Sequence, residues 1–102
     1  MTPSYSFRGE LWQYPGESAW HFITLPQDLA EELRDDAAPF RKAFGSVKVT
    51  ASIAAQRWST SLFPDSKSNS YVLPVKKDIR AAAGISAGDE VDVELELLPA
   101  PK

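Results

Sequence analysis

The segment EVDVELELL, residues 90–98, alternates apolar and acidic side chains more regularly than any other part of the chain. Its apolar side chains share one side of an extended backbone: Val91, Val93, Leu95 and Leu97. This period of two predicts a strand over residues 91–97 that is buried on one face. A β-rich fold is therefore the starting expectation.

Shorter alternating or β-branched stretches predict further strands. They cover residues 6–14, 18–25, 46–53, 57–63 and 71–75. Pro15-Gly16 predicts a turn that joins the first two strands in a hairpin, and Ala55-Gln56 predicts a second hairpin turn. Pro74 cannot donate a backbone hydrogen bond, so it favours an edge strand or a strand end.

Three segments are predicted to be helical. Pro26 suits the first turn of a longer helix, which should end before Pro39 because proline breaks the hydrogen-bond ladder. Residues 39–44 predict a short helical turn that Gly45 ends in the left-handed conformation. Residues 76–84, KKDIRAAAG, predict another short helix with Gly84 just past its end.

Composition narrows the classes of protein. A chain of 102 residues fits a single domain, 1–102, with one hydrophobic core. The chain has no cysteine, which excludes disulfides and thiolate metal sites. Neither an export signal nor a long apolar run is present, so we expect a cytoplasmic protein that does not span a membrane.

Four short segments carry a resemblance to a known family: SLFP, YVLPVKK, IRAAAGI and AGDEV. Through them the chain resembles DUF1905, a bacterial family of uncharacterised domains. The resemblance implies a mainly β, α+β fold: a double-split β-barrel-like pseudobarrel of about six strands with one longer helix and two short ones. It also implies kinship with AbrB-type transcription regulators and their antitoxin relatives, and it brings no settled activity. The chain departs from the family at Ala54-Ala55-Gln56, where relatives often have glycine in the turn. Both hairpin halves are present, so a monomer is favoured over a dimer.

The stretch GISAGD, residues 84–89, can be read as an anion-binding loop or as a turn. Its glycine spacing matches neither the P-loop nor the dinucleotide-binding pattern. A turn accounts for these residues without a ligand, because Gly84 ends a helix and Gly88 supplies a positive φ before Asp89. We therefore interpret Gly84, Gly88 and Asp89 as structural.

Residues typical of catalysis or metal binding do not form a recognisable set. His21 is the only histidine, and no cluster of ligands accompanies it, so we expect a packed or surface side chain and no metal or cofactor. No catalytic residue is assigned. The three tryptophans could form a stacking platform for bases, but we expect at least two of them in the core: Trp12, Trp20 and Trp58.

Basic residues concentrate in one region of an otherwise acidic chain. Residues 57–80 contain five basic and two acidic side chains, a local charge of +3, whereas the whole chain carries −3. The candidate anion- or partner-binding residues are Arg57, Lys67, Lys76, Lys77 and Arg80. Lysines at a helix start are unfavourable with the helix dipole, which can mean that an anion binds there. The alternative is two solvated lysines beside Asp78.

These observations leave three classes of function. The leading hypothesis is a non-catalytic binding or interaction module whose partner is an unknown protein or an anionic ligand. The alternative is an AbrB-like, nucleic-acid-binding regulator or antitoxin-like protein, and the third class is a small enzyme. The acidic net charge disfavours nucleic acid, because affinity for it comes mostly from basic groups at phosphates.

Overall fold

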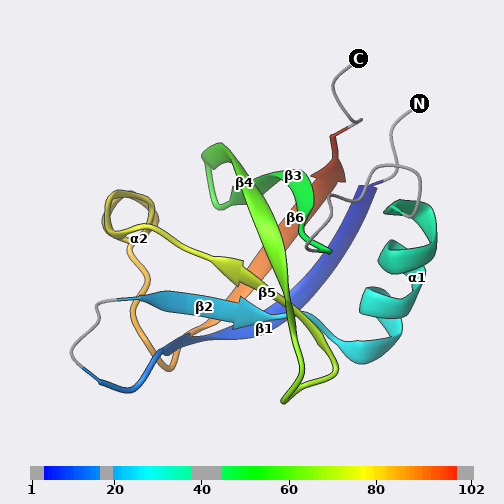
Figure 1. Ribbon diagram of the computed structural model, residues 1–102. Helices are drawn as coiled ribbons and strands as arrows, with labels where there is room; N and C mark the ends of the chain where they lie inside the picture. Colours follow the sequence, from blue (N-terminus) through cyan, green and yellow to red (C-terminus); the bar gives the residue numbers. More distant parts are fainter. Residues whose placement is uncertain (1–3, 17–19, 38–44, 99–102) are drawn as a thin grey trace.

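The computed structural model describes residues 4–16, 20–37 and 45–98 (Figure 1). Within them the elements follow one another as β1 (Ser4–Gln13), β2 (His21–Thr24), α1 (Gln27–Ala37), β3 (Val47–Ile53), β4 (Gln56–Asp65), β5 (Ser70–Pro74), α2 (Lys77–Ala83) and β6 (Glu90–Leu97). The strands close into one antiparallel barrel in the order β1-β2-β5-β4-β3-β6. The predicted mainly β fold with six strands is confirmed.

Both predicted hairpins are present, but one turn lies a residue earlier than predicted. Residues Leu11 and Ile23 face each other in the β1–β2 hairpin. In the β3–β4 hairpin Ile53 pairs directly with Gln56, so the loop is Ala54-Ala55 rather than Ala55-Gln56. Ala54 has φ +54°, the positive φ that two-residue hairpin loops require.

The last strand closes the barrel. Leu95 of β6 lies opposite Tyr5 of β1 on one side and opposite Ala51 of β3 on the other. The four apolar side chains predicted for its inner face are all buried: Val91, Val93, Leu95 and Leu97. Sequence alternation therefore identified the inward face of the strand that joins the two ends of the sheet.

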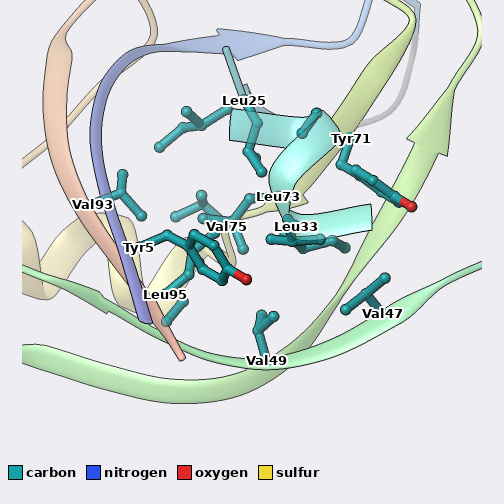
Figure 2. Close-up of a cluster of buried hydrophobic side chains, with 14 of the residues drawn as sticks. Tyr5, Leu25, Leu33, Val47, Val49, Tyr71, Leu73, Val75, Val93 and Leu95 are labelled. Carbon is teal, nitrogen blue, oxygen red and sulfur yellow. The ribbon is translucent and has the colours of Figure 1, made fainter. Parts of the chain in front are cut away.

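The core fills the barrel and extends under α1 (Figure 2). Ala30 and Leu33 of α1 are fully buried, whereas Leu29 is partly buried against the same cluster. The helix begins just after Pro26, close to the predicted start, and its described part runs to Ala37. Burial of one leucine side chain contributes about 2 kcal/mol, so Leu33 alone is a substantial anchor for the helix.

The predicted short helix over residues 39–44 lies outside the described residues. Just after it, Gly45 has φ +81°, the left-handed conformation that the sequence predicted. Pro74 ends β5, in agreement with its predicted position at an edge or a strand end.

The segment 84–90 forms a hydrogen-bonded turn. Gly84 follows α2 with φ +69°, and Gly88 has φ +98°. Asp89 binds the backbone of Ser86 through both its N–H and its carboxylate, at 3.0 and 2.8 Å. The N–H of Gly88 donates to the carbonyl of Leu11 at 2.8 Å, which attaches the turn to β1. These N–H groups are therefore bonded within the protein.

The two described helices lie on opposite sides of the barrel (Figure 1). Two residues separate helix α2 from the end of β5. Its residues Ile79 and Ala83 pack against the core, as does Ile85 just after the helix. Across the described ranges, no helix has the length and apolar content needed to cross a membrane.

Candidate functional site

A pocket forms where the start of β2 meets the end of β5. Phe22 pairs with Pro74, and the N–H of Val75 donates to the carbonyl of His21 at 3.0 Å. This pairing places the Trp20-His21 dipeptide beside the segment that leads into α2. The resulting hollow of about 320 Å³, here called the basic pocket, is lined by Trp20, His21, Pro74, Val75, Lys76, Lys77 and Arg80.

Among the described residues, the charged side chains that line the basic pocket are all cationic. In the described part of the chain, ion pairs join Arg8 to Glu90 and Asp92 and join Arg57 to Glu96, but none involves the pocket cations. The nearest acidic residue in sequence is Asp78, whose carboxylate accepts a hydrogen bond from the Ile79 N–H. The positive charge of Lys76, Lys77 and Arg80 is therefore not neutralised by an observed ion pair.

Arg80 and His21 form the inner wall of the pocket. His21 is 9% exposed, and its Nε2 lies 3.1 Å from Nη1 of Arg80. A guanidinium group only donates hydrogen bonds, so Nε2 of His21 must accept this one and the ring proton must be on Nδ1. The Nε of Arg80 is buried and has no hydrogen-bond partner within the described residues. This contact orients the guanidinium at the pocket.

Helix α2 itself contributes little beyond placing these side chains. It has seven residues, and Lys76 at its N-cap position makes no side-chain capping hydrogen bond. The positive charge at the pocket therefore comes from the side chains of Lys76, Lys77 and Arg80 rather than from the start of the helix.

Trp20 belongs to a second hollow as well. This one, about 470 Å³ and here called the aromatic hollow, is lined by Trp12, Tyr14, Trp20, Phe22, Pro64, Asp65 and Val72. The Trp20 and Phe22 rings stack with centroids 6.0 Å apart and an interplanar angle of 13°. Phe22 also contacts Trp12 at 5.2 Å, yet Trp20 remains 60% exposed.

The expectation that at least two tryptophans lie in the core is wrong. Only Trp58 packs against the core cluster. Trp12 is half-buried and its Nε1 donates to Thr24 Oγ1 at 2.9 Å, and Trp20 is exposed. The reason is strand alternation: Leu11 and Ile23 point into the barrel, so the neighbouring Trp12 and Phe22 point outward.

The structure brings together three of the five predicted binding residues. Lys76, Lys77 and Arg80 share the basic pocket, but Arg57 and Lys67 do not line it. The Arg57 guanidinium binds Glu96 at 3.3 Å and borders a different hollow, and Lys67 lies in the exposed turn after β4. Sequence proximity within residues 57–80 was therefore a poor guide, because β5 separates the turn that contains Lys67 from α2, and the Arg57 side chain is paired with β6.

Trp20 and His21 were not among the residues predicted to bind a ligand with the basic residues. They are more than fifty positions away in the chain, and only the β2–β5 pairing makes them neighbours. No local motif in the sequence predicts that register.

Over residues 4–16, 20–37 and 45–98, no three His, Asp or Glu side chains come together in a way that could hold a metal ion.

A closed antiparallel barrel with a cationic pocket beside exposed aromatic rings defines a small β-barrel domain with a surface site. The family model described as Domain of unknown function (DUF1905) matches residues 7–95. The match covers most of the chain, so the protein belongs to this family. No curated protein sequence matches the chain.

Proposed function

We propose that this protein is a non-catalytic binding module and that its basic pocket binds an anionic ligand, such as a phosphate group. The observation that supports the proposal is the meeting of Lys76, Lys77 and Arg80 around one pocket, whose lining within residues 4–16, 20–37 and 45–98 includes no acidic residue. An anion there would interact favourably with each of the three. Among the residues that the structure describes, those lining the pocket do not include a serine, threonine or cysteine nucleophile.

The two kinds of cation supply different parts of the recognition. Lys76 and Lys77 are exposed, so each acts as a mobile point charge worth about 0.2–1 kcal/mol to a bound anion. Arg80 is half-buried and held against His21, so its guanidinium needs less ordering when it binds. The ring of His21 already accepts from Arg80 at Nε2, which leaves that atom badly placed to act as a general base.

The AbrB-type resemblance supplies the alternative, a nucleic-acid-binding regulator. The outer face of β6 carries four acidic side chains, of which Arg8 and Arg57 pair with three, so a net negative charge remains that would repel a long polyanion: Glu90, Asp92, Glu94 and Glu96. A single phosphate or a short anionic segment at α2 avoids that repulsion. We therefore favour a compact anionic ligand over a duplex that covers a large surface.

The test is calorimetric titration with inorganic pyrophosphate at low salt. Lys76→Ala combined with Lys77→Ala should weaken binding by about tenfold, because two exposed cations are lost. Lys48→Ala combined with Lys67→Ala is the matched control, since both lysines are exposed and lie outside the pocket. Each double variant changes the net charge from −3 to −5.

The control should keep its affinity to within about twofold, and both double variants should melt at or slightly above the wild-type temperature. Equal weakening in the two double variants would mean that net charge alone attracts the anion. An absence of pyrophosphate binding by the wild type would refute the proposed function.

A further inference from the structure

Trp20 connects the two hollows of this surface. It lines the basic pocket together with Lys76, Lys77 and Arg80, and it lines the aromatic hollow together with Trp12 and Tyr14. A ligand seated on this indole ring therefore reaches cations on one side and aromatic rings on the other. Volumes of about 320 and 470 Å³ each fall in the range of small-molecule sites.

The stack of rings explains why Trp20 can stay exposed without collapsing onto the surface. Phe22 lies between Trp20 and Trp12, with centroid separations of 6.0 and 5.2 Å, and the Tyr14 ring meets Phe22 edge-on at 6.5 Å. This arrangement supports a large indole that is 60% exposed. An exposed, supported aromatic ring is a stacking surface for a flat ligand group.

The charges of the two hollows determine how a ligand is oriented. Of the described residues, the charged ones that line the basic pocket are cations, whereas Asp65 is the charged one that lines the aromatic hollow. The Asp65 carboxylate also accepts hydrogen bonds from Ser68 and would repel a phosphate. A ligand with an anionic end and an uncharged aromatic end therefore fits in one orientation only.

We propose that the ligand is a nucleotide, with its phosphate in the basic pocket and its base stacked at Trp20 towards the aromatic hollow. The inference rests on the proposed function, to which it adds the class of ligand. Two sources carry this chemistry: a free nucleotide, and a nucleotide unit of a single-stranded nucleic acid. The acidic outer face of β6 restricts a strand to a short contact beside α2.

The first comparison is between ADP and pyrophosphate, which share a diphosphate and differ by the nucleoside. Stacking of one base should make ADP bind at least about tenfold more tightly to the wild type. Trp20→Ala should weaken ADP binding at least about tenfold more than pyrophosphate binding, so that the two affinities become similar, whereas Trp20→Phe should restore part of the difference. Phe63→Ala is the matched control, since Phe63 is 45% exposed and lines neither hollow.

The combined loss of Lys76 and Lys77 should weaken both ligands by a similar factor. ADP and pyrophosphate of equal affinity would overturn the nucleotide inference and leave anion binding intact. Binding of neither ligand would refute the proposed function itself, so the two failures are distinct. Phenyl phosphate that binds as tightly as AMP would also overturn the inference, because any aromatic phosphate would then suffice.

Binding of a short 5′-phosphorylated oligothymidylate, measured at low and moderate salt, distinguishes a free nucleotide from a single-stranded nucleic acid as the source of the ligand. Affinity well above that of ADP, with a steep loss as salt rises, identifies a single strand. Affinity equal to or below that of ADP identifies the free nucleotide. In both cases Trp20→Ala must weaken binding, and an oligonucleotide that binds Trp20→Ala as tightly as the wild type overturns the proposed site.

Discussion

Tyr5 links the barrel to the helix that covers it, and this link makes stability depend on pH. The side chain lies on β1 and is 6% exposed, and its hydroxyl donates a hydrogen bond to Asp36 near the end of α1. Burial raises the pKa of Tyr5 above its ordinary value, and the carboxylate of Asp36 raises it further. Both causes favour the neutral phenol in the folded protein.

The sign of the effect follows from linkage. The folded chain keeps the Tyr5 proton at a pH where the unfolded chain has lost it, so this stabilisation is complete below about pH 10. Above that value it decreases by up to about 1.4 kcal/mol per pH unit. The decrease continues until the folded protein also loses the proton.

Tyr5→Phe removes both the hydrogen bond and the titration. At about pH 7 we expect the variant to be less stable by about 1–2 kcal/mol, since the lost bond has a charged acceptor that water can still reach. At about pH 11 the wild type has lost about 1.4 kcal/mol through Tyr5, so the two proteins should differ little. Lysine titration is common to both and cancels in the difference.

The measurement is urea unfolding of both proteins at a series of pH values between about 7 and 11. Tyr14→Phe is the control, because Tyr14 is exposed and should change stability by less than about 0.5 kcal/mol. A Tyr5→Phe deficit that stays constant or grows up to pH 11 would refute the reasoning, since the native state would then not retain the phenol proton.

Three further predictions concern the barrel. Gly88→Val should destabilise the domain by more than about 1 kcal/mol, since a β-branched residue resists φ +98°, and an unchanged melting midpoint would contradict this. Gly9→Ala should cost about 1–3 kcal/mol in chemical denaturation, because its Cβ would lie 2.8 Å from Cγ2 of buried Ile23; wild-type stability would show that Ile23 moves cheaply. All six strands close within one chain, so light scattering should report a monomer, and a concentration-independent dimer would overturn that expectation.

Much of the fold could be predicted because the responsible interactions are local. The alternation in β6 identifies its buried face, since side chains of any strand point to opposite sides of a sheet. Pro26 predicted the start of α1 to within a residue, because proline suits the first turn of a helix. Gly45 was predicted to be left-handed, and its φ agrees.

Errors arose where two local signals competed. Large apolar side chains favour the core, and this preference placed at least two tryptophans there. Consecutive side chains of a strand point to opposite faces. Leu11 points into the barrel, so the neighbouring Trp12 indole faces outward. The hairpin turn was misplaced by one residue because no glycine marks the positive φ that Ala54 adopts.

By itself, the sequence determined which residues are cationic and that Lys76, Lys77 and Arg80 lie close together, because they span only five positions. Only the tertiary structure decided that Arg57 and Lys67 are elsewhere and that Trp20 and His21 complete the pocket. The physical reason is that strand pairing joins residues that are distant in the chain. The β2–β5 register depends on how the whole barrel closes around its core, which no short segment specifies.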